Sequence, residues 1–147
     1  MPADSRAAYV DTSVLVKAYV EEPDSARALA TLARHVVVSC AIAPIELTSA
    51  IRRRREQGDL TDRDVDLVRR RLQRDRRGWE LHAVDESVLE RAEDVARTVS
   101  VRTLDALHLA CALTFRQSAG MEVPFVTADH RQRRAATALG LEAVFVE

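Results

Sequence analysis

The sequence predicts an α/β fold, with a mostly parallel central sheet and helices on both of its faces. Short apolar runs of strand length alternate along the chain with longer segments whose apolar residues recur at helical spacing. Parallel strands need crossover connections, and the helical segments supply them. The length of 147 residues, of which 47% are hydrophobic and 31% charged, suits a single domain spanning residues 1–147.

The first strand is predicted at residues 7–10, an apolar run that ends at Asp11. Apolar residues at helical spacing over 13–20 predict a helix that begins after Thr12 or Ser13, either of which can cap it.

A second helix is predicted to begin at Asp24 or Ser25, after the break at Pro23, and to run to about residue 34. The apolar run at 36–40 predicts the second strand.

An arginine-rich helical hairpin is predicted at about residues 44–77. Pro44 suits the first position of its first helix, which ends near Gly58. Thr61 or Asp62 caps the second helix. The carboxy-terminal half then continues with a strand at 79–84, helices at 86–99 and 103–115, a strand at 124–127, a helix from its cap at Asp129 to Leu139, and a last strand at 143–146.

Charge is distributed unevenly along the chain. The net charge is −1, yet residues 52–77 hold eleven arginines and six acidic residues, which leaves −6 for the rest of the chain. Such a basic segment suits phosphate binding, and it equally suits an ordinary solvated helix face.

The chain shows no apolar run of membrane-spanning length, and its start lacks the layout of a secretion signal. We therefore expect a cytoplasmic protein without a membrane partner. Cys40 and Cys111 lie in apolar stretches without metal-ligand spacing, so we expect both to be buried and inert.

Four acidic residues lie where a predicted strand ends or a predicted helix begins: Asp11, Glu46, Asp105 and Asp129. The carboxyl ends of parallel strands meet at one edge of a sheet, so these acids are expected to share a pocket. Each acid alone also suits a helix cap or the first turn of a helix. Clustered carboxylates repel one another, and a hard divalent cation relieves that repulsion. The pattern therefore predicts a metal-dependent enzyme that cleaves phosphodiesters.

Three further polar residues lie beside the predicted pocket. Ser13 and Thr127 can hydrogen-bond a water molecule or a carboxylate, or cap a helix. His108 follows Asp105 by one helical turn, and we expect it to be a hydrogen-bonded core residue, with a role in proton transfer as the alternative.

Four sequence blocks resemble those of PIN-domain ribonucleases, and most closely VapC-type toxins of bacterial toxin–antitoxin pairs. The blocks span nearly the whole chain: Val10-Asp11-Thr12-Ser13, Glu46, the run from Arg102 to Ala110 that contains Asp105 and His108, and Val126-Thr127-Ala128-Asp129. The resemblance implies an acidic site of Asp11, Glu46, Asp105 and Asp129, assisted by Ser13. It also implies Mg²⁺ or Mn²⁺ dependence, RNA cleavage, a homodimer and inhibition by a small VapB-like antitoxin.

The mechanism that fits uses water as the nucleophile. Asp11 and Asp105 are the expected direct metal ligands, because Mg²⁺ is held by a few carboxylates and keeps several waters. Glu46 and Asp129 would complete the shell of a second ion, bind through water, or orient the attacking water. Arg131, Arg133 and Arg134 follow Asp129 and are expected to flank the pocket.

Two rival functions remain on sequence grounds. A haloacid-dehalogenase-like phosphatase needs a second aspartate at the position of Ser13 and a late lysine, whereas Lys17 is the chain's single lysine. A regulatory nucleic-acid-binding module would use the acids only as helix caps.

Overall fold

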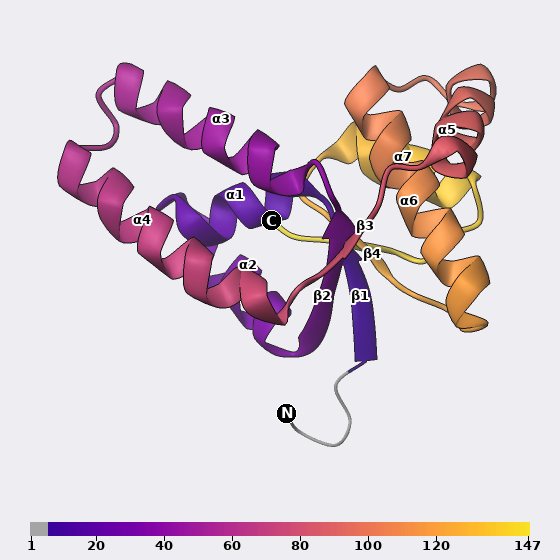
Figure 1. Ribbon diagram of the computed structural model, residues 1–147, viewed down its shortest axis with the longest axis horizontal. Coiled ribbons are helices and arrows are strands. Elements are labelled where there is room, and N and C mark those ends of the chain that lie inside the picture. The colour runs from indigo at the N-terminus through magenta and orange to yellow at the C-terminus, as the bar shows by residue number, and fades with distance from the viewer. Residues whose placement is uncertain (1–5) are drawn as a thin grey trace.

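A computed structural model describes residues 6–147, and a five-stranded, all-parallel sheet lies at its centre (Figure 1). The strand order is β3-β2-β1-β4-β5, so the predicted α/β class is confirmed. The elements are β1 (Arg6–Val10), α1 (Thr12–Tyr19), α2 (Ser25–Ala33), β2 (His35–Cys40), α3 (Ala43–Glu56), α4 (Asp62–Asp75), a 3₁₀ turn (Arg76–Gly78), β3 (Glu80–His82), α5 (Glu86–Thr98), α6 (Thr103–Ala119), β4 (Phe125–Thr127), α7 (His130–Ala138) and β5 (Ala143–Phe145).

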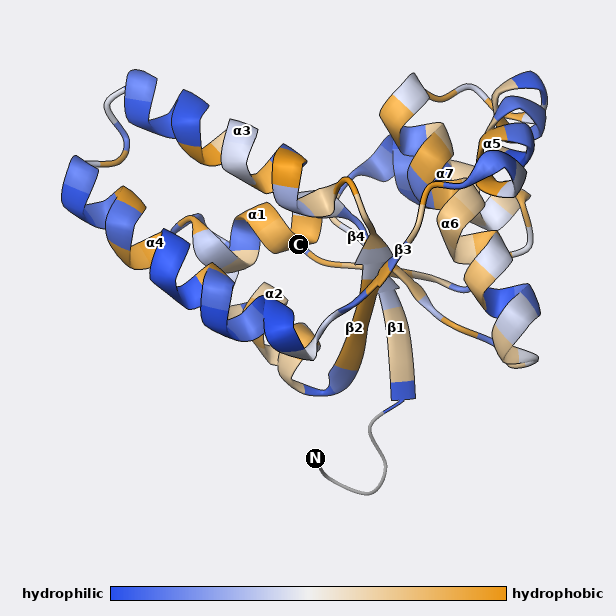
Figure 2. Ribbon diagram, viewed as in Figure 1, coloured by the Kyte–Doolittle hydropathy of each residue, from blue (hydrophilic) through white to orange (hydrophobic). Residues whose placement is uncertain are grey.

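Helices cover both faces of the sheet, with α1 to α4 on one side and α5 to α7 on the other (Figure 1). Side chains alternate along each strand, so neighbours enter different cores. In β1, Tyr9 packs with α5, α6 and α7, whereas Ala8 and Val10 pack with α1 to α4. The strands are mainly apolar, whereas α4 and the far half of α3 consist mostly of hydrophilic residues (Figure 2).

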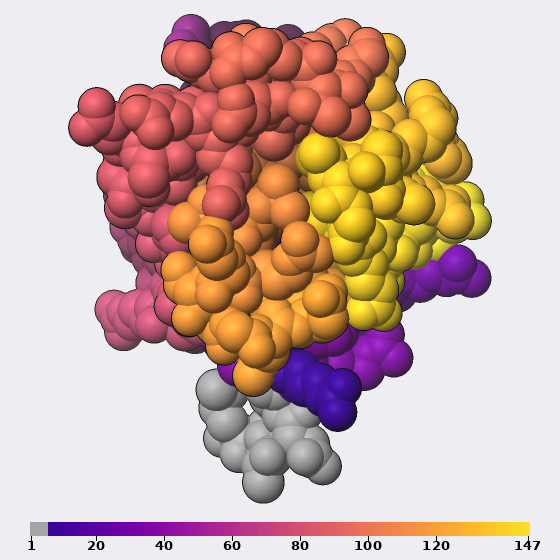
Figure 3. Space-filling view, turned by 90° about the vertical axis from the view of Figure 1, so that its right-hand side faces the viewer, coloured from indigo at the N-terminus to yellow at the C-terminus, as the bar shows by residue number. Residues whose placement is uncertain are grey.

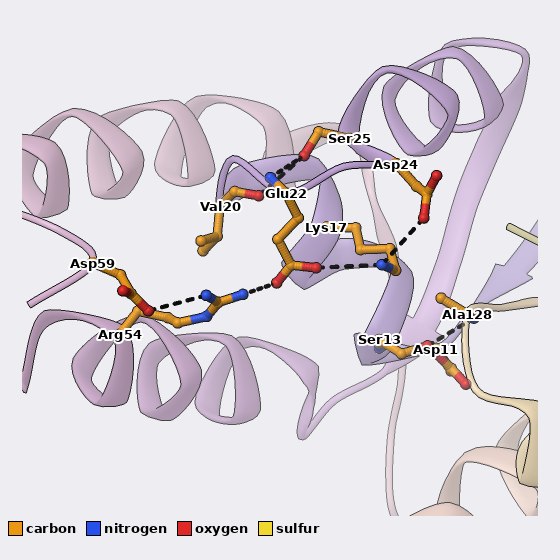
Figure 4. Close-up of polar contacts among 10 residues, drawn as sticks. All are labelled: Asp11, Ser13, Lys17, Val20, Glu22, Asp24, Ser25, Arg54, Asp59 and Ala128. Carbon is orange, nitrogen blue, oxygen red and sulfur yellow. Dashed lines mark hydrogen bonds and ion pairs between the residues drawn. The ribbon is translucent and has the colours of Figure 1, made fainter. Parts of the chain in front are cut away.

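The hairpin of α3 and α4 projects away from the sheet, and its connecting loop lies at the far end (Figure 1). Thr61 caps α4 in a capping box, in which its side chain accepts from the Asp64 amide and the Asp64 carboxylate accepts from the Thr61 amide. A network of ion pairs ties the hairpin to the chain after α1: Glu22 contacts both Lys17 and Arg54, and Arg54 also contacts Asp59 (Figure 4).

Three predicted boundaries need correction. Helix α1 is capped by Asp11, not by Thr12 or Ser13, because the Asp11 carboxylate accepts from the Ser13 amide. Helix α6 continues past residue 115 and ends only at Gly120, which has the left-handed φ of 65° that favours glycine. The strand predicted at 79–84 is shorter, at Glu80–His82.

The carboxy-terminal part of the chain lies beside α6 on the face shown in Figure 3, where Arg116 of α6 donates to the Gly140 carbonyl oxygen at 2.8 Å. Within residues 6–147, no helix is long and apolar enough to cross a membrane. The expectation about a secretion signal concerns the start of the chain, which lies mostly outside the described residues.

Candidate active site

The sheet topology brings the ends of two distant strands together. Strands β1 and β4 are adjacent and parallel, with Val10 opposite Val126, so Asp11 and Asp129 follow them at the same edge of the sheet. The chain order also reverses here, since β2 lies on one side of β1 and β4 on the other. Such a switch point is where open α/β sheets bind their ligands.

Asp11 is a buried carboxylate with three donors. It is 3% exposed, and Oδ1 accepts from the Ser13 amide at 2.9 Å and from the Ser13 hydroxyl. Its Oδ2 accepts from Thr127 Oγ1 at 2.6 Å. Burial raises the pKa of Asp11, and the nearby His108 and the hydrogen bonds from Ser13 and Thr127 only partly oppose that increase.

Ser13 and Thr127 connect the ends of β1 and β4. Ser13 Oγ accepts from the Ala128 amide at 2.9 Å while bonding to Asp11 (Figure 4). Thr127 Oγ1 accepts from the Asp129 amide at 3.1 Å while donating to Asp11. Both hydroxyls therefore fix the position of Asp11 relative to the turn that carries Asp129.

The other three predicted acids share an open cavity of about 690 Å³. Glu46 reaches it from the first turn of α3, Asp105 from the first turn of α6, and Asp129 from the cap of α7. Asp11 is not among the lining residues, which also include Arg102, Thr103, Leu104, His130, Arg131 and Arg134. Three of the four acids therefore line one cavity, while Asp11 is buried and linked to the Asp129 amide through Thr127.

Asp105 and Asp129 repel each other across the cavity. Burial and the charge of Asp129 raise the pKa of Asp105, and this increase exceeds the opposing effects of His108 and of the Arg102 amide and charge. The Asp129 carboxylate accepts from the amides of Arg131 and Gln132, which makes it the cap of α7 as predicted. Two acidic groups that repel each other at an open cavity favour the binding of a cation between them.

Glu46 is held by a buried histidine. Nε2 of His108 lies 2.6 Å from Glu46 Oε1 and 3.1 Å from the Thr12 hydroxyl, and Nδ1 lies 2.8 Å from the Tyr9 hydroxyl. Thr12 also donates to Glu46 Oε1 at 2.8 Å. His108 is thus the hydrogen-bonded core residue that we expected, and its partner is one of the predicted site acids.

The pair of Glu46 and His108 stabilises its charged form. Burial alone would raise the pKa of Glu46, but the hydrogen bond and charge of His108, with the Thr12 hydroxyl, lower it overall. Burial alone would lower the pKa of His108, but the hydrogen bond and charge of Glu46, with the charges of Asp11 and Cys40, raise it overall. These opposite shifts favour a carboxylate beside an imidazolium.

The donor chemistry suits a hard divalent cation. Within residues 6–147, no group of three or more His, Cys, Asp or Glu side chains is close enough together to hold a metal ion by itself. Mg²⁺, however, usually takes only one or two protein carboxylates and keeps its remaining ligands as water and phosphate. The mutual repulsion of Asp105 and Asp129 at an open cavity fits that mode of binding.

Several residues at the site were not predicted from the sequence. Tyr9 and Thr12 complete the hydrogen bonds of His108, and their spacing from it along the chain gives no signal. Gln132 is 1% exposed and donates from Nε2 to the Asp105 carbonyl oxygen at 3.2 Å, which ties α7 to α6. Its position three residues after Asp129 is the one hint in the sequence, and it does not indicate that the side chain is buried.

The two cysteines are buried, as expected, and they lie together. Cys40 ends β2 and Cys111 lies in α6, with their sulfur atoms 3.3 Å apart. This contact packs α6 against β2 one helical turn beyond His108.

Comparison with known proteins identifies the family. The PIN domain family matches residues 8–138. The chain is 34% identical over 146 residues to Ribonuclease VapC46 of Mycobacterium tuberculosis, an alignment that covers 94% of this chain and 96% of the relative. A chain of a toxin-antitoxin complex from Klebsiella pneumoniae has the same fold, with a TM-score of 0.60 and 14% identity over 94% of this chain and 96% of that one. The chain described here therefore belongs to the PIN-domain family and resembles its VapC-type members.

Proposed function

We propose that the chain is a metal-dependent endoribonuclease and the toxin of a toxin–antitoxin pair. The observation that carries this proposal is the open cavity lined by Glu46, Asp105 and Asp129, with Asp11 buried beside it. These acids come from four separate parts of the chain, and ordinary helix capping does not require them to meet. The 34% identity to a protein named as a ribonuclease supports the same reaction.

The proposed site residues divide into two groups. Asp105 and Asp129 would hold Mg²⁺ or Mn²⁺ at the cavity, because their oxygen donors match these hard cations, and Glu46 would contact the ion through a water molecule. When bound, such a cation would withdraw charge from the phosphate and promote ionisation of water. The three donors of Asp11 leave one acceptor position of its carboxylate, on Oδ2, for a metal ion.

The chain's own residues would orient the reaction. Glu46 is fixed by His108 and Thr12, so its carboxylate can align an attacking water molecule. Arg102 and Arg131 at the rim would bind the phosphodiester of the RNA. A water nucleophile leaves no covalent enzyme intermediate.

The proposed partners follow from the relatives. One structural neighbour belongs to a toxin-antitoxin complex, which supports a small VapB-like antitoxin as the inhibitor of this chain. A homodimer and a cytoplasmic location are part of the same proposal. Light scattering of the purified protein, alone and with the candidate antitoxin, measures both assembly states.

The test of the reaction is the Asp105→Asn variant. It keeps the size of the side chain and removes the charge at the cavity, so it should fold normally and lose RNA cleavage in Mn²⁺. Glu86→Gln is the matched control, because Glu86 lies in the first turn of α5 and does not line the cavity. It should cleave like the parent.

Cleavage by Asp105→Asn at the parent's rate would refute the site assignment. Calorimetry with Mn²⁺ distinguishes the proposed nuclease from the rival function, in which the acids serve only as helix caps. Metal binding that is absent from the parent, or unchanged in Asp105→Asn, would favour a regulatory nucleic-acid-binding module. The second aspartate that a phosphatase of the haloacid-dehalogenase kind requires is missing, since Ser13 stands at its position.

A further inference from the structure

Two neighbouring cavities share a pair of arginines. The acidic cavity of about 690 Å³ is bordered by Arg131 and Arg134, and the same two residues line a second cavity of about 310 Å³. The rest of the second cavity comes from the end of α5 and from α7: Val99, Ser100, Ala135 and Ala138. Arg131 and Arg134 therefore lie at the boundary between the two cavities.

The two guanidinium groups are available for a ligand. Arg131 and Arg134 are exposed, and neither forms an ion pair with any of residues 6–147. Residues three apart on a helix lie on the same face, so both can contact one extended ligand. Arg133 differs, because its guanidinium lies 5.2 Å from the centre of the Phe145 ring.

The chemistry of this path suits a phosphodiester chain. Arginine presents a planar fork of donors that matches the oxygens of a phosphate. The carboxylates next to it repel the same phosphates, so a substrate needs basic contacts close to the acids but outside them. Beyond the arginines, Val99, Ala135 and Ala138 give the second cavity an apolar wall, against which a nucleobase can pack.

The arginine-rich hairpin is a weaker candidate for this role. None of the arginines of residues 52–77 lines the acidic cavity. Several of them are already paired with acids of the same hairpin, as Arg52 is with Glu56 and Arg55 with Asp62. The arginines at the acidic cavity are instead Arg102, before α6, and Arg131 and Arg134 of α7, and the last two continue to the second cavity.

We propose that single-stranded RNA leaves the acidic cavity over Arg131 and Arg134 and places its next base in the cavity formed by Val99, Ser100, Ala135 and Ala138. The two arginines bind consecutive backbone phosphates on one side of the cleaved bond. This inference rests on the proposed nuclease function and adds to it the direction in which the RNA is bound.

The test measures binding apart from cleavage. The full chain is titrated in EDTA with a fluorescently labelled single-stranded oligoribonucleotide of mixed sequence, and anisotropy is recorded at several salt concentrations. The variants are Arg131→Gln with Arg134→Gln, the matched control Arg133→Gln, and Ala138→Phe, which fills the second cavity without changing charge. Gel analysis confirms that the RNA stays intact, and circular dichroism confirms that each variant is folded.

The double variant should bind roughly tenfold more weakly, and the slope of log K against log salt should fall in magnitude by about 1.4, or about 0.7 for each lost phosphate contact. Arg133→Gln should match the parent in both quantities. Ala138→Phe should weaken binding and leave the salt slope unchanged, because it blocks the base and not the phosphates.

Equal losses in the double variant and in Arg133→Gln would overturn the proposal, as would parental binding by the double variant or no binding by the parent. Parental affinity in Ala138→Phe would overturn the base position. Cleavage in Mn²⁺ is assayed separately, so a parent that binds RNA as expected but does not cut it counts against the proposed function and not against this binding path.

Discussion

Replacing His108 with alanine should strongly destabilise the protein, because its imidazole is buried and satisfies three partners. The residue is 2% exposed and contacts Glu46, Thr12 and Tyr9. Removing one partner of a buried ion pair costs about 3–5 kcal/mol. Leaving the fully buried Tyr9 hydroxyl without its bond costs about 1–3 kcal/mol more.

The lower ends of these ranges apply here. The Glu46 side chain is 21% exposed and can regain contact with water once His108 is gone. We therefore expect His108→Ala to reduce the free energy of unfolding by about 4 kcal/mol, which lowers Tm by roughly 8–16 °C for a chain of this size. The assay is urea denaturation in EDTA, followed by circular dichroism, so that bound metal plays no part.

His82→Ala is the control, since within residues 6–147 the His82 side chain bonds to the neighbouring Ala83 carbonyl oxygen alone and its loss should cost less than about 0.5 kcal/mol. A double-mutant cycle with Glu46→Gln then isolates the ion pair, and its coupling energy should exceed about 1.5 kcal/mol. A loss below about 1.5 kcal/mol in His108→Ala, or a coupling near zero, would refute the argument that this pair is a buried, mutually stabilising unit.

Three further outcomes are expected. Because the pKa of His108 is raised and that of Glu46 lowered, their pair should stabilise the protein most between about pH 4.3 and about pH 6.5; the histidine contribution is lost as pH rises through its folded pKa, and the glutamate contribution as pH falls through its folded pKa. The free energy of unfolding of the parent, measured in EDTA across pH, should show this maximum. A parent curve that matches that of His108→Ala would contradict the prediction. Gln132→Leu should change the free energy of unfolding by less than about 1 kcal/mol, because it removes the unpartnered Gln132 Oε1 together with the single hydrogen bond to the Asp105 carbonyl oxygen. It should nevertheless slow RNA cleavage, because Asp105 is then held less firmly. Cleavage at the parent's rate would contradict that role. Thr61→Ala should cost about 1 kcal/mol in urea denaturation by removing the cap of α4, and unchanged stability would argue against the capping box.

The order of strands and helices followed from the sequence because it depends on local patterns. Apolar runs and helical spacing are properties of neighbouring residues, so they located the elements to within a few residues. The limits of α6 were missed because its last turn, from Arg116 to Ala119, is polar and carries no apolar signal. The helix ends at Gly120, which is a common helix-ending residue, but no apolar pattern indicated that the helix continues to it.

The partners of the site residues did not follow from the sequence. The pairing of β4 with β1 depends on the whole sheet, and it allows Thr127 to donate to Asp11, a residue 116 positions earlier in the chain. The contact of His108 with Glu46 likewise depends on how α6 packs beside the start of α3. The arginines after Asp129 looked equivalent in sequence, but the packing of Arg133 on Phe145 distinguishes it from its neighbours.

The site concentrates its unbalanced charge at one place. Asp11 accepts from three donors, which only partly offset its burial, and Glu46 contacts His108 and Thr12. Asp105 and Asp129 have no ion-pair partner within residues 6–147, and the charge of Asp129 contributes to the raised pKa of Asp105. Charges of one sign facing an open cavity are stable only while water or a cation screens them. The protein thus pairs Glu46 with His108 and surrounds Asp11 with donors, but leaves the half-buried Asp105 and the exposed Asp129 to a cation that enters the cavity. Charge removal at Asp105 should therefore affect metal binding more than folding.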